Sequence, residues 1–573
     1  MSIQRWPIVV VAVGLLAGAV AFGGEPAANG PEPLGGAGAA EAVATVAGED
    51  ALTSTWFCAG GTTVPDGPFD HTVLVTNLSD EAIDATVEAI GSEGQTELVE
   101  IEVGAGSTTP VRLGDIVEAP WAGASVEVAG GNIVVEHRIE GPAGRDQSRC
   151  TPNPSDTWHF AYGRTALGSR MWLAILNPFP DRAVADITFD TDDGFRNPTD
   201  LNGLLIPGRS VRIIEVGNHA QRHQLVSADV NLRSGRVVVD RVQLLGLEDG
   251  TQLGLDLELG ATEPATAWYF AEGRVGPTMS EIIVVSNPSD ERATVDVVIR
   301  PSAGSAAGPI EPFEVAIAPR SRQEIVVDNE TRVPKPLEHA TIVQSFNGVP
   351  VVVERVVIGG APELVAGGDE VVEDGAEPVE GSEEPVEDSD ATSTDPDATP
   401  EDTDGADDGT AGEESALAPA VESQAAPTQT APLRGSGPGF SAQMGSPVAS
   451  TDQIAIVPTG QDVWLSLLNP GGEAVEVDIG LLNANGEQQL LGEAVTVEAA
   501  DRREVSVDLP DASDPAIVVV RADTPVVVDQ GVVWSDAVGT ADLGNEPLIP
   551  RAGTTSVPDS SGLTAPVVAT PAG

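Results

Sequence analysis

One stretch of this chain is written four times. Each copy opens at an asparagine and carries apolar residues at the sixth, eighth, tenth and twelfth positions after it, with a glycine at the seventeenth. The four copies begin at Asn77, Asn177, Asn287 and Asn469. Successive strand residues point to opposite faces, so this alternation predicts a strand with one buried face in every copy. The chain is therefore predicted to be an array of copied β-modules.

Two further motifs flank this stretch. The first three copies open on an aromatic run that begins at Trp56, Trp158 or Trp268, whereas the fourth has a degenerate start near Ile454. Each copy closes on three aliphatic residues and an acid: Ile133-Val134-Val135-Glu136, Val237-Val238-Val239-Asp240, Val351-Val352-Val353-Glu354 and Val526-Val527-Val528-Asp529. The same start, middle and end in the same order predict duplication of a whole domain.

Strand patterns set the expected fold class. In the first copy we expect seven strands, at 54–59, 71–77, 83–90, 97–103, 108–113, 124–129 and 133–139. Short strands separated by Gly, Asp, Asn and Pro favour a two-sheet sandwich over a barrel. We predict an all-β chain of four tandem immunoglobulin-like β-sandwich repeats, each of about 100 residues.

The predicted domain boundaries follow composition and motif spacing. They are 1–23 for a signal peptide or signal-anchor helix, 24–52 for a flexible stalk, 53–152, 153–262 and 263–362 for repeats 1 to 3, 363–450 for a disordered acidic linker rich in Pro, Gly, Ser and Thr, 451–551 for a degenerate repeat 4, and 552–573 for a disordered tail.

The first segment has the pattern of an export signal. Arg5 precedes an uncharged apolar run from Trp6 to Phe22. The run is long enough to span a bilayer if retained, and Ala19-Val20-Ala21 offers small residues at cleavage spacing. We expect residues from Gly24 onward to lie outside the cytoplasm, either anchored to the cell membrane by the N-terminal helix or secreted after cleavage.

The chain has two cysteines, Cys58 and Cys150, at the two ends of the first copy. Disulfides persist outside the cytoplasm, so we predict a bond between them. The alternative is two separately buried thiols.

Charge excludes one class of partner. The chain has 89 acidic and 28 basic residues, a formal charge of -61, which repels phosphate backbones and disfavours nucleic-acid binding. Residues 369–414 hold 20 acidic residues and no basic one. Such a stretch is predicted to be a disordered, extended spacer, with the fourth repeat on a long tether.

Three sets of residues are candidates for a site. Trp56, Trp158 and Trp268 could form a ligand-binding surface for stacking sugars, or they could plug the end of each sandwich, which is the commoner use of a repeated aromatic. The repeated asparagines are expected to cap strand ends. The closing acids and the basic residues after three of them point to opposite strand faces, so solvated or cross-strand ion pairs are expected rather than catalysis.

No chemistry-bearing motif emerges from the sequence. His219 and His223 lack a visible third ligand, and GxSxG, HExxH and phosphate-loop patterns are absent from it. We therefore expect no catalytic residues, no cofactor and no metal site.

The third copy carries three motifs that together resemble a known repeat: Trp268-Tyr269-Phe270-Ala271-Glu272-Gly273, Asn287-Pro288 and Val351-Val352-Val353-Glu354-Arg355. This combination resembles an actinobacterial family of exported, membrane-tethered envelope proteins, a domain of unknown function. The match spans roughly 54–362 and 451–550, departs at Cys58 and Leu78, and lacks the aromatic opening in the fourth copy. The resemblance implies export and an envelope setting, and it brings no catalytic residues.

These observations lead to an expected function class. We expect a non-enzymatic, extracytoplasmic envelope protein that acts as a spacer, adhesin or binding scaffold for a cell-wall polymer or another envelope protein, with membrane contact only through the N-terminal segment. The alternative is a glycan-acting hydrolase with two carboxylates on separate loops, because such pairs leave no local signature.

Overall fold

The chain is all-β, as predicted. The computed structural model describes residues 43–558 except 248–249, 303–304, 306, 361–438, 508, 510–514 and 536–540. Its sheets are antiparallel, and within these residues the helical elements are four short 3-10 turns, η1 (Leu113–Asp115), η2 (Thr199–Leu201), η3 (Val216–Asn218) and η4 (Val327–Asn329). No described helix is long and apolar enough to cross a membrane, and the predicted export segment, 1–23, lies outside the described residues.

Repeat 1 consists of two four-stranded sheets with the orders β1-β6-β3-β4 and β5-β2-β7-β8. Its strands are β1 (Ser54–Gly61), β2 (Asp70–Asn77), β3 (Ile83–Gly91), β4 (Thr96–Val103), β5 (Ser107–Arg112), β6 (Ala122–Val128), β7 (Ile133–Gly141) and β8 (Gly144–Arg149). The seven predicted strands are confirmed to within two residues at each end. The eighth strand, β8, was not predicted.

Repeats 2 and 3 have the same two-sheet plan. Repeat 2 contains β9 (Thr157–Phe160), β10 (Arg170–Asn177), β11 (Ala183–Thr191), β12 (Gly194–Arg196), β13 (Asn202–Ile206), β14 (Ser210–Glu215), β15 (Val226–Ser234), β16 (Val238–Gly246) and β17 (Gln252–Leu259). Repeat 3 contains β18 (Ala267–Phe270), β19 (Arg274–Val275), β20 (Met279–Asn287), β21 (Ala293–Pro301), β22 (Phe313–Ile317), β23 (Ser321–Val326), β24 (Leu337–Ser345), β25 (Val352–Gly359) and β26 (Gly439–Met444).

Repeat 4 differs because one long strand, β33 (Ala516–Ser535), serves both of its layers. The first half of β33 pairs with β27 (Ala449–Val457) and β29 (Val475–Leu482), and the second half pairs with β28 (Asp462–Leu468) and β34 (Ala541–Pro547). The remaining strands are β30 (Gln488–Leu490), β31 (Val495–Val497), β32 (Arg502–Ser506), β35 (Ile549–Pro550) and β36 (Thr555–Ser556).

The segment predicted as a linker over 363–450 differs from the structure at its C-terminal end. Residues 439–444 form β26, which pairs with β25 of repeat 3 from Glu354↔Met444 to Gly359↔Gly439. β27 of repeat 4 begins five residues after β26 ends. The acidic stretch is thus inserted between two paired strands of repeat 3, and repeat 4 does not follow it on a tether. Residues 361–438 themselves lie outside the described residues.

The repeated motif does what its pattern predicts. The apolar positions of the second and third copies are buried on β11 and β21, and those of the first and fourth are buried apart from the half-buried Ile83 and Leu481. Each asparagine caps a strand end: its amide donates to the carbonyl four residues on, at 2.7 to 2.8 Å, and its carbonyl oxygen accepts the backbone N–H two residues on.

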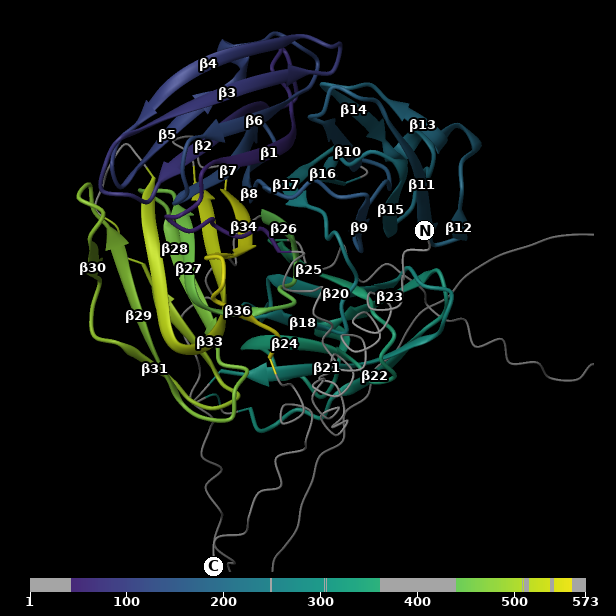
Figure 1. Cartoon of the computed structure of the whole chain (residues 1–573). Helices are drawn as coiled ribbons and strands as arrows, with labels where there is room; N and C mark the ends of the chain where they lie inside the picture. The colour runs from purple at the N-terminus through teal and green to yellow at the C-terminus, as the bar shows by residue number, and fades with distance from the viewer. Residues whose placement is uncertain are drawn as a thin grey trace, which may run out of the picture. The chain divides into compact units, whose positions relative to one another are not determined.

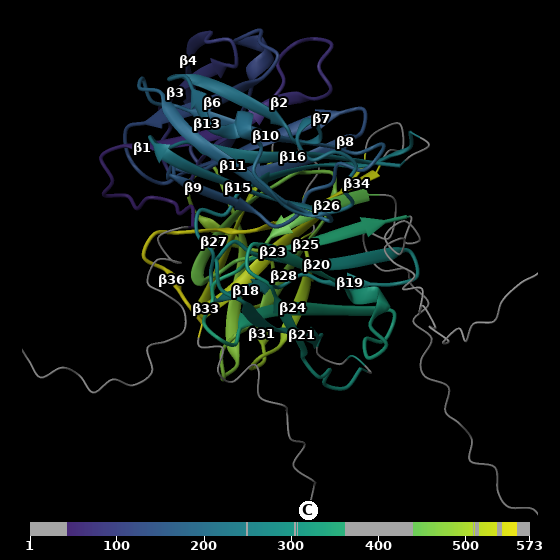
Figure 2. The ribbon, with the colours of Figure 1, turned by 90° about the vertical axis from the view of Figure 1, so that its right-hand side faces the viewer.

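The last strands of repeats 1 to 3 (β8, β17 and β26) lie together with β34 of repeat 4, and we refer to these four as the last strands (Figures 1 and 2). β8 contacts β17, β17 contacts β26, β26 contacts β34, and β34 contacts β8. The four repeats belong to one compact unit.

Repeat 1 and repeat 4 share a hydrophobic core. The core of repeat 1 includes Ala44 and Val46 from the N-terminal side and Ile454, Ile456, Ile517 and Ile549 from repeat 4. Val46 also pairs with Arg551 as an isolated bridge. The contacts between repeats therefore run from 1 to 2, 3, 4 and back to 1.

Candidate functional site

The predicted cysteine pair is joined. Cys58 on β1 and Cys150, the residue after β8, form a disulfide and are fully buried. The bond ties the first strand of repeat 1 to its last.

The three opening tryptophans lie in the core. Trp56, Trp158 and Trp268 are exposed by 1%, 0% and 2%, and the indole N–H groups of Trp158 and Trp268 donate to the carbonyls of Val237 and Val351 at 3.0 and 2.7 Å. Their ring faces are covered, so they offer no open platform on which a sugar could stack. They match the alternative prediction, in which the tryptophans plug the end of each sandwich.

Trp158 and Trp268 also line a pocket. The pocket lies at the carboxyl ends of β8, β17 and β26, and its other lining side chains include Arg149, Glu263 and Met444. Arg149 lies opposite Glu136 on the neighbouring strand, in the register position where Leu259 lies opposite Asp240 and Met444 lies opposite Glu354. Repeat 1 therefore has a cation where repeats 2 and 3 have an apolar residue. One cation and one carboxylate in a pocket lined by two tryptophans suit binding rather than hydrolysis.

The closing acids form a repeated structural device. Glu136, Asp240, Glu354 and Asp529 are exposed by 3% or less. The expectation that these acids are solvated is therefore wrong, and Glu354 forms its ion pair with Arg241 of the preceding repeat. The expectation failed because a neighbouring repeat covers the strand face that the acids occupy.

Each closing acid accepts backbone N–H groups from the opening strand of the preceding repeat. Ala59 donates to Asp240, Ala161 to Glu354 and Ala271 to Asp529, each at 2.7 Å. Ile456 of repeat 4 makes the equivalent backbone hydrogen bond to Glu136 of repeat 1. We call these contacts joints 1–2, 2–3, 3–4 and 4–1.

The basic residue that follows a closing acid in the sequence lies near the closing acid of the next repeat, and so belongs to the joint between the two repeats. The Nε2 atom of His137 lies 3.5 Å from Asp240 Oδ2, and Arg241 donates to Glu354 in a fully buried ion pair. Arg355 acts through its charge on Asp529. The fourth position is held by Gln530, which has no charge.

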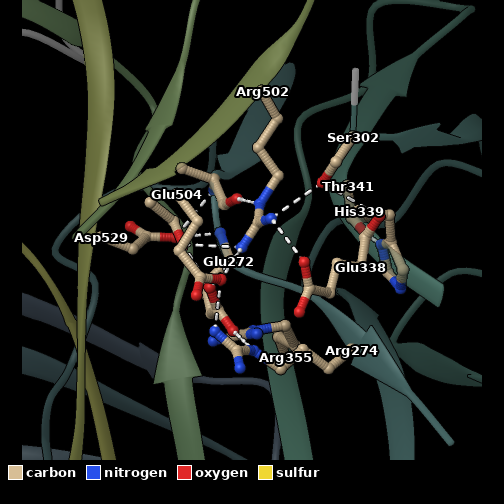
Figure 3. Close-up of polar contacts among 12 residues, drawn as sticks. Glu272, Arg274, Ser302, Glu338, His339, Thr341, Arg355, Arg502, Glu504 and Asp529 are labelled. Atoms are coloured by element: carbon tan, nitrogen blue, oxygen red, sulfur yellow. Dashed lines mark hydrogen bonds and ion pairs between the residues drawn. The ribbon is translucent and has the colours of Figure 1, made fainter. Parts of the chain in front are cut away.

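Joint 3–4 adds a network of buried charges (Figure 3). Glu272, the residue after Ala271, forms ion pairs with Arg274 and with Arg502 of β32, the latter at 2.7 Å. Glu504 lies 2.6 Å from Arg274 and 3.2 Å from Arg502. Arg502 further donates to Ser302 at 2.8 Å.

The network has the electrostatics of a structural joint. Burial would raise the pKa of Glu272, but the charges of Arg274 and Arg502 outweigh it and hold that pKa well below its usual range. Burial raises the pKa of Glu504, which Arg274 opposes. Glu272 is ionised and 2% exposed, so it can neither exchange protons at neutral pH nor reach a substrate. The arrangement holds two repeats together and does not suit acid–base chemistry.

A single carboxylate joins all four last strands. Asp542 of β34 accepts the backbone N–H groups of Arg145 on β8, Leu255 on β17 and Phe440 on β26, at 3.1 to 3.2 Å. It is 3% exposed. Repeats 1, 2 and 3 are thus each hydrogen-bonded to one side chain of repeat 4.

Within the described residues no three His, Cys, Asp or Glu side chains are placed to hold one ion. His219 lies 3.4 Å from Asp200 and His223 lies 3.6 Å from Asp192, so each faces its own acid.

The comparisons with known proteins give no family. No family model matches the chain, and no curated protein matches it. Three solved structures show weak likeness. A structure titled Thermotoga maritima 1070 is 22% identical, covers 17% of this chain and 82% of its own, and has a TM-score of 0.15. A tetra-tandem repeat from the extending region of a large adhesion protein (10% identity, 83% and 98% covered) and a Ca2+-stabilised adhesin with which an Antarctic bacterium binds ice (12%, 88% and 99%) each have a TM-score of 0.09. Scores this low carry no argument about this chain.

Sequence reasoning missed the joints, although a signal for them was present. Each closing acid occupies the same position of a motif that is present in all four copies. A solvated residue would not need to be an acid in every copy. The joint alanine is likewise fixed in the first three copies. The degenerate start of repeat 4 hid the fourth joint, where Gln453 Nε2 donates to the carbonyl of Val526 at 3.0 Å, as the tryptophan indoles donate in repeats 2 and 3.

Proposed function

We propose that this chain is a non-enzymatic, extracytoplasmic envelope protein of the actinobacterial type it resembles, and that its four immunoglobulin-like repeats form a rigid binding scaffold. The observation that carries this proposal is the set of buried joints. Carboxylates that accept backbone N–H groups across an interface fix the register of neighbouring repeats. Because repeat 4 packs on repeat 1, the repeats do not extend end to end, which favours a scaffold over a spacer.

The partner is proposed to be a cell-wall polymer or another envelope protein. The buried tryptophans do not support polymer stacking, so the pocket beside Arg149 and the surfaces of the repeats are the places where a partner would bind. Export is supported by the apolar first segment and by the disulfide, since such bonds persist outside the cytoplasm.

Co-sedimentation with purified cell-wall sacculi tests this proposal. The chain without residues 1–23 should bind saturably, and Arg149→Leu, which installs the residue type found in repeat 2, should weaken binding if the pocket takes part. Cross-linking to envelope proteins in cells identifies the partner if sacculi are not bound. Turnover of a wall polymer by the purified chain, lost on replacement of one acid, would overturn the non-enzymatic proposal.

A cellular measurement tests export. Cys58 and Cys150 should resist alkylation in intact cells until a reductant is added. Thiols that alkylate freely without reductant would place the chain in the cytoplasm.

A further inference from the structure

The four joints differ in the group that faces the closing acid. An arginine serves joints 2–3 and 3–4, and His137 serves joint 1–2. Burial lowers the pKa of His137 well below its usual range, so this histidine is neutral at physiological pH. Joint 4–1 has Gln530 at the equivalent position. Joints 1–2 and 4–1 are therefore the two where the closing acid faces no charged group from the preceding repeat's motif, and burial raises the pKa of Asp240 at joint 1–2 to about 7.

Joint 4–1 also lacks a covalent connector. Repeats 1 and 2, 2 and 3, and 3 and 4 are linked by the short segments 150–156, 260–266 and 445–448. Short connectors keep two binding surfaces at high effective concentration. Repeats 4 and 1 are held by noncovalent contacts, among them the hydrogen bonds of Val46 with Pro550 and Ala552, both at 2.9 Å.

We propose that joint 4–1, the joint without a covalent connector, is a proton-operated latch, closed while Glu136 carries its proton and released as that carboxyl ionises, with joints 2–3 and 3–4 left in place.

The surroundings of Glu136 favour its neutral form. Glu136 is 3% exposed and accepts hydrogen bonds from the backbone of Ile456 and from the side chain of Gln147, whose amide also donates to the Ile456 carbonyl at 2.9 Å. Burial raises the pKa of Glu136 to about 8, against the hydrogen bonds and the charge of Arg149. A protonated carboxyl keeps an oxygen that can accept the Ile456 N–H.

The other titratable groups near the latch act in the same direction. Glu546 on β34 feels the charges of Glu136, Asp146 on β8 and Glu258 on β17, and burial together with these acids raises its pKa well above the usual range. Arg149 acts on Glu136, Glu258 and Glu546 alike, and Arg241 also acts on Glu258. Arg241 is already paired with Asp256 and Glu354, so Arg149 does not balance a full set of ionised acids, and each further ionisation weakens the joint.

The sign of the pH dependence follows from linkage. The closed joint holds the pKa of Glu136 at about 8, and in an open joint the carboxyl returns towards its ordinary 4.5. The closed form therefore binds the proton more tightly. The ratio of closed to open joint is greatest at low pH, falls by up to about tenfold per pH unit between these two values, and levels off above them.

Native-state hydrogen exchange of the full chain tests the latch. The protection factor of the Ile456 amide should fall by up to about tenfold per pH unit between pH 5 and 8, whereas that of Ala161 at joint 2–3 should fall much less. Glu136→Gln keeps an acceptor and cannot ionise, so it should remove the larger part of the fall at Ile456, and the neighbouring acids account for the remainder. Gln530→Arg supplies the missing charge and should reduce it.

Two outcomes would overturn the proposal. One is a protection factor at Ile456 that falls no faster with pH than at Ala161. The other is a fall that persists unchanged in both Glu136→Gln and Gln530→Arg. Gln530→Arg retains Glu136, so it keeps the test informative if Glu136→Gln folds poorly.

Discussion

At the scale of single residues, the joints are alike in one position and different in the next. An alanine or isoleucine donates its N–H to every closing acid, but the following residue is Gly60, Tyr162, Glu272 or Val457. A Cβ at Gly60 would lie 2.3 Å from the Ala174 side chain, so joint 1–2 needs the close approach of a glycine. Each joint thus has its own complementary chemistry, which specifies the order in which repeats pair.

Replacing Glu272 should be costly because it balances two buried cations. Glu272→Gln leaves Arg274 and Arg502 without that carboxylate, and we expect a loss of about 3–5 kcal/mol in the free energy of unfolding, measured by denaturant titration. The matched control is Asp290→Asn, which removes an exposed ion pair with Arg320 and should leave the unfolding midpoint unchanged. Equal effects in the two variants would contradict the structural role of the network.

The disulfide should add to stability through the unfolded chain. Cys58 and Cys150 are 92 residues apart, and a closed loop of that length is worth about 4–5 kcal/mol in the chain-entropy model. Reduction should lower the thermal midpoint of the chain. A Cys58→Ala/Cys150→Ala chain, already lacking the bond, should show no further shift with reductant.

At the scale of elements, the sequence predicts what lies inside a repeat and misses what lies between repeats. The alternation after Asn77 defines β3 because one face meets the core of its own repeat. β8 reads Gly144-Arg145-Asp146-Gln147-Ser148-Arg149, which has no apolar face to detect. Its side chains Asp146, Gln147 and Ser148 are buried all the same, because the last strands of other repeats surround them. No local pattern contains that information.

The last strands should depend on Asp542. Asp542→Ala leaves three backbone N–H groups from three other repeats without their acceptor, and unsatisfied buried donors cost about 1–3 kcal/mol each. We expect the free energy of unfolding to fall by about 3 kcal/mol or more. Asp478→Ala, on the exposed face of β29, is the control and should change little. A wild-type unfolding curve for Asp542→Ala would show that the hub is dispensable.

At the scale of the whole molecule, composition marks the acidic stretch off from the repeats but misplaces its C-terminal end in the architecture. A change of composition marks where apolar patterning stops, but it does not reveal that β25 and β26 pair across the gap. Gly439–Met444 contains few strand signals of its own. The placement depends on a partner strand about 80 residues earlier, which only the fold brings alongside.

A cut in the inserted segment should therefore not release repeat 4. After limited proteolysis between residues 361 and 438, the two fragments should migrate together in size-exclusion chromatography and separate only in denaturant, because joints 3–4 and 4–1 and the β25–β26 pairing remain. A tethered repeat 4 would instead elute as a separate small species. Conversion of the full-length band on a denaturing gel controls for complete cutting.

The shared core of repeats 1 and 4 also bears on how the protein is made. Repeat 1 leaves the ribosome first, yet its core is completed by Ile454, Ile456, Ile517 and Ile549, which are synthesised hundreds of residues later. Until those residues arrive, an apolar surface of repeat 1 stays uncovered. A chain that is truncated before repeat 4 is thus marked by its own exposed surface as unfinished, and quality-control proteases can distinguish it from the completed protein.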